Sequence, residues 1–182
     1  EKVFDFVDER VGLKLLTAKM LNEAVPGGSR WAYVFGSVLL FIFIMQAVTG
    51  VLLMLYYVPT ADHAYASTQY ILHDVDYGWF LLSYHFWGST AMVVCVFAHM
   101  SQVFLWGAYK KPRELIWLVG LGLFAIVMGF GFTGYLLPWD QRAYWATTVG
   151  VEIMDKTPLI GDFISRLLKG GATPGQMTLS RF

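Results

Sequence analysis

Charged side chains and cysteines are both scarce in this sequence. Asp, Glu, Lys and Arg make up 14% of the 182 residues, whereas soluble domains average about 25%, and apolar residues make up 57%. The formal net charge is zero, so nothing in the charge balance favours a nucleic-acid partner. The one cysteine, Cys95, excludes an intrachain disulfide and any cage of several thiolates around zinc or an iron–sulfur cluster. These shortages indicate an integral membrane protein.

Three apolar stretches are each long enough to cross a bilayer as a helix, which takes about 20 residues. The first stretch ends at Pro59 and the third at Pro138, and proline disfavours a continuing helix. The predicted spans are residues 33–58, 78–109 and 114–137. The fold class that follows is an all-α integral membrane bundle with three transmembrane helices.

The remaining segments are predicted to lie at the membrane surfaces. Residues 1–28 have the alternation of apolar and charged side chains that is typical of an amphipathic surface helix, followed by a turn. Residues 59–76 are expected to form a polar loop. Two short amphipathic helices facing outward are predicted at residues 140–154 and 158–169, and neither is long enough to cross. Residues 178–182 resemble the start of a fourth transmembrane helix, of which the sequence holds only the beginning.

Basic residues are distributed unevenly around the spans. Residues 59–76 contain no Lys or Arg, whereas the turn at residues 110–113 contains three. Because cytoplasmic loops are enriched in Lys and Arg, we expect the N-terminus and this turn on the cytoplasmic side. The loop and everything after Pro138 then face outward. A bacterial inner membrane is the expected location.

The second span holds two histidines, His85 and His99, fourteen positions apart. An α-helix rises about 1.5 Å and turns about 100° per residue, so the two imidazoles lie about 21 Å apart on nearly one face. Each of the other two spans has a pair of glycines at the same spacing. In an up-and-down bundle the glycines fall at the depths of the histidines: Gly36 and Gly120 with His99, Gly50 and Gly134 with His85.

One histidine and two glycines at each depth predict two haems. Histidine is a common axial ligand of haem iron, and glycine lets a large flat group approach a helix backbone. His85 would bind the outer iron and His99 the inner one. The alternative is that the glycines serve helix packing and the histidines are hydrogen-bonded core residues or proton relays. Bis-histidine ligation also needs two more imidazoles, which must come from another helix.

Several motifs between about Trp31 and Phe182 resemble those of cytochrome b. They are QAVTGVLLMLYY in the first span, YGW and the paired histidines in the second, KKPREL at the turn, GYLLPWDQ after the third span, and TLSRF. KKPREL, LPWDQ with a following YWA, and PLIGDF are closer to the chloroplast form. The resemblance identifies residues 29–182 as an incomplete N-terminal haem-binding bundle of cytochrome b, the membrane subunit of quinol:cytochrome c and plastoquinol:plastocyanin reductases.

This resemblance implies a low-potential haem on His85 and a high-potential haem on His99. The second axial ligands would lie on the next helix, in a C-terminal part of the same protein or in a separate subunit. A quinol-oxidation pocket is implied along the outward segment after the third span. Its candidate residues are Tyr135, Pro138, Trp139, Tyr144, Trp145 and Ala146. The aromatic members of this set would equally suit an interfacial belt.

The sequence departs from the family pattern at three positions. Arginines usually stand three residues before the first ligand and three after the second, where this chain has Leu82 and Gln102. Other cations would then pair with the haem propionates, and the candidates are Arg30 and Arg113 for the inner haem and Arg142 for the outer one. Val34 replaces the cysteine that attaches an extra haem in the chloroplast form, so no covalent haem is expected.

The implied function is that of a dihaem subunit that oxidises quinol at the outer face and sends electrons across the membrane through two b haems. The expected partners are a Rieske-type iron–sulfur protein and a c-type cytochrome, in a dimeric complex embedded in lipid. Two other functions remain open. One is a dihaem b-type membrane anchor of a dehydrogenase or hydrogenase, which would not need the two outward helices. The other is a haem-free structural subunit packed by its glycines.

Overall fold

The computed structural model describes Ala18 and residues 31–182. The chain divides into two units, residues 1–34 and residues 35–182. In the first unit Ala18 is helical and Trp31–Val34 form a short 3-10 helix, η1. The rest of the predicted surface helix, and Arg30, lie outside the described residues. Over the described part of the chain the secondary structure is entirely helical, so the predicted fold class is confirmed.

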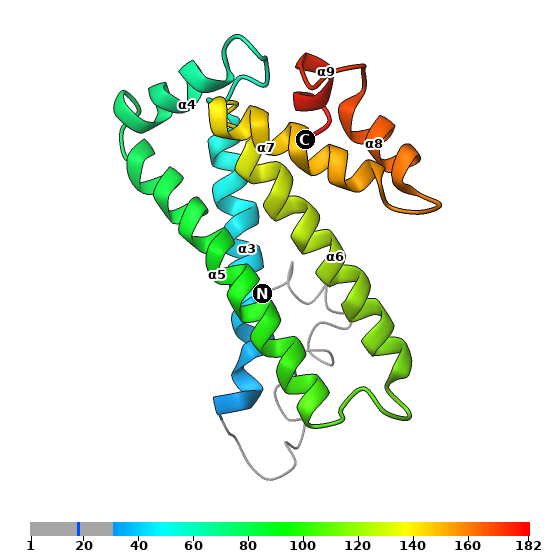
Figure 1. Ribbon diagram of the computed structural model, residues 1–182. Coiled ribbons are helices and arrows are strands. Elements are labelled where there is room, and N and C mark those ends of the chain that lie inside the picture. The colour runs from blue at the N-terminus through cyan, green and yellow to red at the C-terminus, as the bar shows by residue number, and fades with distance from the viewer. Residues whose placement is uncertain (1–17, 19–30) are drawn as a thin grey trace, which may run out of the picture. The chain divides into compact units, whose positions relative to one another are not determined.

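Three long helices form the frame of residues 35–182 (Figure 1). They are α3 (Phe35–Met54), α5 (Gly78–Leu105) and α6 (Glu114–Leu136), and each lies inside one of the predicted spans. All three are long and apolar enough to cross a bilayer. Helices suit this environment because every backbone polar group inside them is paired without help from water.

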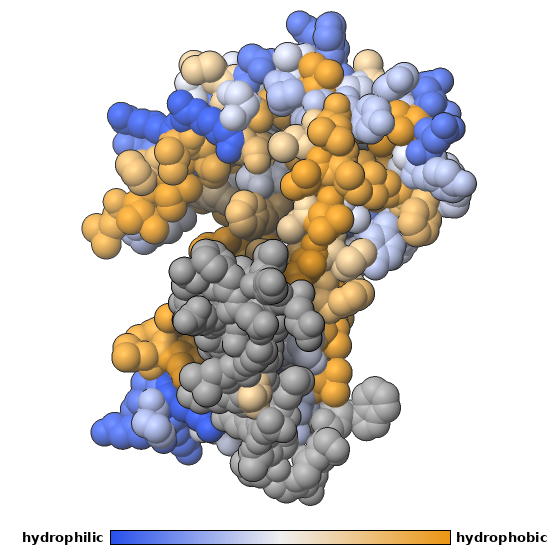
Figure 2. Space-filling view, turned by 180° about the vertical axis from the view of Figure 1, so that it is seen from behind, coloured by the Kyte–Doolittle hydropathy of each residue, from blue (hydrophilic) through white to orange (hydrophobic). Residues whose placement is uncertain are grey.

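The surfaces of these helices are largely apolar and uncovered. Phe41, Leu115 and Phe130 are 60%, 77% and 70% exposed, and no residue in the most apolar stretch of α6 is buried. Figure 2 shows hydrophobic side chains along the spans and hydrophilic ones gathered toward the ends. Lipid is the solvent that makes such an exposed apolar surface favourable.

Within residues 35–182, the two ends of the frame differ in how much chain they hold. We call the end with residues 55–77 and 137–182 the loop side, and the end with residues 106–113 the turn side. Helices α4, α7, α8 and α9 all lie on the loop side (Figure 1). Within residues 35–182, the turn side holds one tight connection, between α5 and α6.

The expected polar loop at residues 59–76 is partly helical, which corrects the prediction. Helix α4 spans Ala64–His73, and Ala64, Ser67 and Ile71 form its buried face. Two of these three side chains are small or polar, so the apolar periodicity of the segment is weak. Gly78 follows at the start of α5, where a Cβ would overlap the carbonyl of Ile71.

Helices α7 (Gln141–Asp155) and α8 (Gly161–Lys169) form a hairpin on the loop side, close to the predicted ranges. The side chain of Asp140 caps α7 by accepting a 2.7 Å hydrogen bond from the amide of Ala143. The buried face of α7 consists of Ala143, Thr147 and Val151, one turn apart, and Leu136 at the end of α6 is buried with it. The Asp of the LPWDQ motif therefore has a local structural role.

Two polar ties join distant parts of the loop side. The Gln176 side chain accepts from the amide of Ala61 (2.7 Å) and donates to the carbonyl of Pro59 (3.0 Å). The Tyr57 hydroxyl donates a 2.6 Å hydrogen bond to the carbonyl of Leu137. Where a fourth span was expected to begin, the structure shows the short helix α9 (Gln176–Leu179), with Arg181 and Phe182 beyond it.

Candidate functional site

The two span histidines lie against glycines of the neighbouring helix. A Cβ added at Gly50 would lie 3.4 Å from Cε1 of His85, and one added at Gly36 would lie 3.8 Å from Cε1 of His99. Helices α3 and α5 thus pack so that each imidazole rests on a stretch of α3 without a side chain. The equal fourteen-residue spacing on the two antiparallel helices produces this pairing at both depths.

The imidazole of His85 is fixed by Thr49, a residue that sequence reasoning did not single out. Its Oγ1 lies 2.8 Å from Nδ1 of His85 and 2.7 Å from the carbonyl of Met45. The hydroxyl has one proton, and the carbonyl can only accept it, so the network assigns the proton between Thr49 and His85 to Nδ1. Nε2 of His85 is then unprotonated and free to ligate a metal.

The imidazole of His99 has a different environment. Its Nδ1 is buried and has no hydrogen-bond partner within the described part of the chain. Nothing comparable to the Thr49 contact therefore holds this ring within the described residues. The two imidazoles therefore both lie against a glycine of α3, but only His85 has a hydrogen-bond partner at Nδ1 among the described residues.

Gln46 is a second residue that the sequence reasoning missed. Its side-chain Nε2 donates a 2.8 Å hydrogen bond to the carbonyl of His85, and its Oε1 is buried without a partner among the described residues. A Cβ at Gly88 would lie 2.7 Å from that Nε2, so the glycine makes room for the amide. The available signal was a polar pair, Gln46 and Thr49, inside an apolar span.

The glycines of α6 are placed differently from those of α3. A Cβ added at Gly120 or Gly134 would meet no atom within 4 Å, and the same holds for Gly122 and Gly129. The pair predicted from spacing is therefore not distinguished from the other two by its surroundings. Helix α6 touches α5 mainly through apolar and aromatic groups, such as the Phe97 and Phe124 rings at 5.2 Å.

The cations proposed to pair with propionates lie at the ends of the helices. Arg113 is the N-cap residue of α6 on the turn side, and its side chain is exposed. Arg142 is exposed near the start of α7 on the loop side. Gln102, at one of the three departures from the family pattern, has a buried Oε1 without a partner among the described residues.

The aromatic residues predicted for the quinol pocket form a row on the loop side. The ring of Tyr144 packs edge-on against Trp139 at 6.2 Å and against Trp145 at 5.4 Å. Tyr135 and Trp145 are more than half exposed, whereas Pro138 and Ala146 are partly covered. Trp139 has a positive φ of 52°, which turns the chain sharply between α6 and α7.

Tyr57 lies beyond the end of α3, next to this row. Burial raises the pKa of its phenol to about 12, because the charged form loses hydration there. Its hydroxyl thus remains a donor to the Leu137 carbonyl throughout the neutral pH range. Through this bond the segment after α3 holds the start of the Pro138–Trp139 turn.

A separate groove of about 260 Å³ opens between α3 and α5. It is lined by Phe41, Ile42, Met45, Gln46, Tyr84, Trp87, Gly88 and Ala91. None of the residues predicted to bind haem or quinol lines it. The histidine–glycine pairs are thus distinct from this groove between the same two helices.

The histidine sites fit a planar iron macrocycle on three observations. Each imidazole faces α3 where a Cβ is missing. The Thr49 contact leaves Nε2 of His85 as the metal-binding atom. The unpartnered Nδ1 of His99 shows that this second imidazole is not held by a hydrogen bond within the described residues, as a purely structural buried histidine would be.

Comparison with known families decides the identity. The family described as cytochrome b/b6/petB matches residues 20–182 of the chain. The chain belongs to the cytochrome b/b6 family. This result confirms the resemblance in the sequence motifs, including their closeness to the b6 form.

Relatives of known name agree with this membership. Cytochrome b6 of Mastigocladus laminosus is 41% identical over 180 residues, which cover 99% of this chain and 84% of the relative. Cytochrome b6 of Euglena gracilis is 39% identical over 181 residues, with coverage of 100% and 84%. A solved structure of a hyperthermophilic respiratory complex III superposes with a TM-score of 0.83 at 31% identity, covering 97% of this chain and 48% of that one.

A cytochrome b/b6 is a haem-binding electron-transfer subunit of a membrane quinol oxidoreductase, and this member is one too. It is an integral membrane protein that works within a multi-subunit complex of the bc type. The membrane anchor of a dehydrogenase and the haem-free structural subunit are not favoured.

Proposed function

We propose that this cytochrome b binds two b-type haems, one at each histidine depth, and that electrons from quinol cross the membrane between them. The observation that supports this most strongly is the repeated histidine–glycine contact, His85 with Gly50 and His99 with Gly36. A single such contact would be ordinary helix packing. Two contacts at one spacing, in a chain of this family, favour two equivalent cofactor sites.

The chain's own contribution is placement and exclusion of water. Haem, when bound, supplies reversible one-electron transfer. His85 and His99 each provide one axial nitrogen, and the second axial ligands come from a further helix of the protein or from another subunit. Gly36 and Gly50 let a flat group lie close to α3, and Gly120 and Gly134 are proposed to do the same on α6. Arg30, Arg113 and Arg142 remain the candidate partners of the propionates.

Quinol oxidation is proposed for the loop side, along the row Tyr135, Pro138, Trp139, Tyr144, Trp145 and Ala146. Aromatic rings packed edge to face and a sharp turn at Trp139 form an apolar surface beside the polar loop-side helices, which suits an amphiphilic ring. The loop side would face outward and the turn side the cytoplasm of a bacterium, because Lys110, Lys111 and Arg113 lie on the turn side.

The proposed partners follow from this arrangement. One electron from each quinol would pass outside to a Rieske-type iron–sulfur protein and a c-type cytochrome, and the other would cross inward to quinone. Val34 offers no thiol at the position of the covalent haem site of the chloroplast form, so only non-covalent haem is proposed. The complex is proposed to be a dimer.

Single replacements of the histidines test the two-site proposal. In the intact complex, His85→Leu should remove one component of the reduced-minus-oxidised b-type spectrum and His99→Leu the other, because each imidazole serves a separate iron. His73→Leu is the matched control, since His73 is an exposed histidine on α4. Loss of the same component in both variants, or of none, would contradict the assignment.

A further inference from the structure

We propose that Thr49 is a positioning residue that acts through His85 and lowers the reduction potential of the loop-side haem. The inference rests on the two-haem function proposed above. It concerns a difference in hydrogen bonding between the two histidines, which the spacing of glycines and histidines does not predict. In the spacing the two depths are equivalent; in the hydrogen bonding they are not.

The contacts of Thr49 fix the direction of its hydrogen bond. Thr49 is 4% exposed, so water does not compete for its hydroxyl. The hydroxyl proton goes to the carbonyl of Met45 at 2.7 Å, with the carbonyl of Gln46 a weaker alternative at 3.3 Å. The lone pairs of Oγ1 therefore accept from Nδ1–H of His85 at 2.8 Å. The side-chain amide of Gln46 also donates a hydrogen bond to the backbone carbonyl of His85.

The corresponding position at the other depth offers nothing comparable. Thr49 directly precedes Gly50, which contacts His85, and Phe35 directly precedes Gly36, which contacts His99. A phenyl ring has no acceptor atom for an imidazole N–H. In agreement, Nδ1 of His99 is buried without a partner among the described residues. The two depths thus differ at the residue before each glycine, which is Thr49 beside Nδ1 of His85 and Phe35 at the depth of His99.

An acceptor on Nδ1–H makes an imidazole a stronger electron donor to a metal on Nε2. Hydrogen bonds to the outer nitrogen of a metal-bound histidine raise its basicity and fix its ring orientation. A more basic ligand stabilises ferric over ferrous iron and lowers the reduction potential, which is tuned by this kind of contact. The loop-side haem should therefore hold its electron less tightly than it would without the Thr49 hydroxyl.

The test is a redox titration of both b-type components in the purified complex, comparing the wild type with Thr49→Val and Thr49→Ser. Valine keeps the shape of threonine and removes the acceptor, whereas serine keeps the acceptor. We expect Thr49→Val to raise the loop-side midpoint potential, changing the ratio of reduced to oxidised haem at a fixed ambient potential by up to about tenfold. Thr49→Ser should stay near the wild type, and the turn-side component should not move in either variant.

Thr90→Val is the matched control. Thr90 lies on α5 and donates its hydroxyl to the carbonyl of Phe86 four residues earlier, as Thr49 does on α3, but it touches no imidazole in the described contacts. It should leave both potentials unchanged. The low-spin ferric EPR signal gives a second readout, because release of the imidazole ring shifts the loop-side g values in Thr49→Val alone.

Each outcome decides the matter. An unchanged loop-side potential in Thr49→Val, with both haems present, would overturn the inference, as would equal shifts in the valine and serine variants. If valine caused loss of the loop-side haem while serine retained it, positioning of His85 by the hydroxyl would be supported. A wild-type complex with only one b-type component would instead contradict the proposed function.

Discussion

At the scale of single residues, the site depends on atoms that are absent as much as on those present. Gly50 and Gly36 contribute the lack of a side chain where α3 meets the two imidazoles. The tolerance is narrow, because the nearest imidazole carbon would lie at ordinary contact distance from one added Cβ, and anything larger would overlap it. Replacements of graded size at Gly50 should therefore have graded effects.

Gly50→Ala should retain most of the loop-side haem signal, and Gly50→Val should lose most of it. The single methyl of alanine would lie 3.4 Å from Cε1 of His85, whereas the branches of valine would push the ring out of position. The measurement is the reduced-minus-oxidised spectrum of the purified complex. Gly129→Val, on a surface of α6 with no atom nearby, should leave both components intact. Equal losses at Gly50 and Gly129 would point to general misfolding.

The residue scale also shows where sequence reasoning reached its limit. His85, His99 and the α3 glycines could be chosen because their spacing repeats, and spacing is visible in a sequence. Thr49 could not, since a threonine inside a span is commonplace and its role depends on which face of α3 meets α5. That register is a property of packed helices, and the contact with Nδ1 appears only once it is known.

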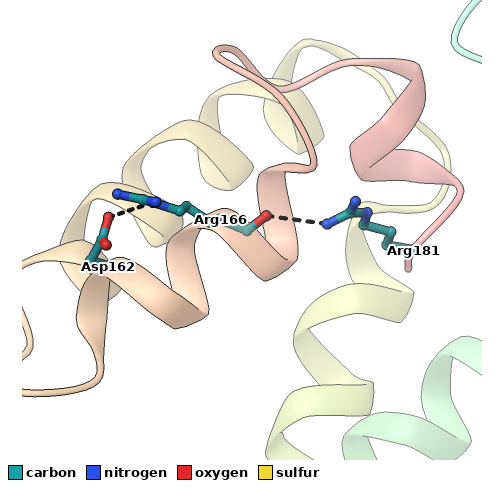
Figure 3. A network of polar contacts seen from close by, with 3 residues as sticks. All are labelled: Asp162, Arg166 and Arg181. Carbon is teal, nitrogen blue, oxygen red and sulfur yellow. Dashed lines mark hydrogen bonds and ion pairs between the residues drawn. The ribbon is translucent and has the colours of Figure 1, made fainter.

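At the scale of elements, the loop-side helices hold one another through their ends. The last carbonyls of a helix lack partners within it. At the end of α8 the carbonyls of Arg166 and Leu167 accept from the Arg181 guanidinium, and the carbonyl of Lys169 accepts from the Thr178 hydroxyl at 2.7 Å. Figure 3 shows the backbone of Arg166 between this contact and its own side-chain pair with Asp162.

Arg181→Ala should loosen the end of α8 more than Arg166→Ala does. The first change removes charge-assisted bonds to two carbonyls, worth about 1 kcal/mol in all at an exposed site, and the second removes an exposed ion pair worth about 0.3 kcal/mol. Hydrogen exchange of the α8 amides in the detergent-solubilised complex should speed up about fivefold in the first variant and less than about twofold in the second. Equal rates in the two arginine variants would show that capping by Arg181 does not stabilise α8.

The helices with the longest apolar sequence patterns were the easiest to predict from the sequence. The three spans stand out because unbroken runs of about twenty apolar residues are rare outside membrane-spanning helices. The hairpin of α7 and α8 was predicted from its amphipathic pattern and the break at Thr157–Pro158. Helix α4 was missed because its buried face is made of Ala64, Ser67 and Ile71 and its N-cap, His63, makes no capping hydrogen bond through its side chain. Its helical form depends on packing against neighbours that are remote in sequence.

At the scale of the whole molecule, the described residues bury little of their apolar surface in one another. The exposed side chains of α3, α5 and α6 require lipid or further protein around them. The chain covers 84% of the cytochrome b6 relatives and 48% of the complex III subunit it matches, so those proteins contain segments without a counterpart here. We propose that the second axial ligands lie in such additional structure.

Orientation in the membrane can be tested with single cysteines. In a Cys95→Ser background, cysteines introduced as Asp62→Cys on the loop side and Lys111→Cys on the turn side should react with an impermeant thiol reagent from opposite faces. The positive-inside rule predicts that position 62 is labelled in intact cells and position 111 only after the membrane is opened. Labelling of both positions from one face would contradict the bundle of membrane-crossing helices, and reversed labelling would contradict the proposed orientation.

The uninterrupted course of α5 has one more consequence. Both imidazoles stand on this single 28-residue helix, so the gap between them is fixed by the pitch of the hydrogen-bonded backbone. Insertions or thermal motion in the surface segments would not change this distance between the two histidines. Electron tunnelling falls steeply with distance, so the rate of the proposed transfer between two haems would be set by the spacing of His85 and His99 along α5.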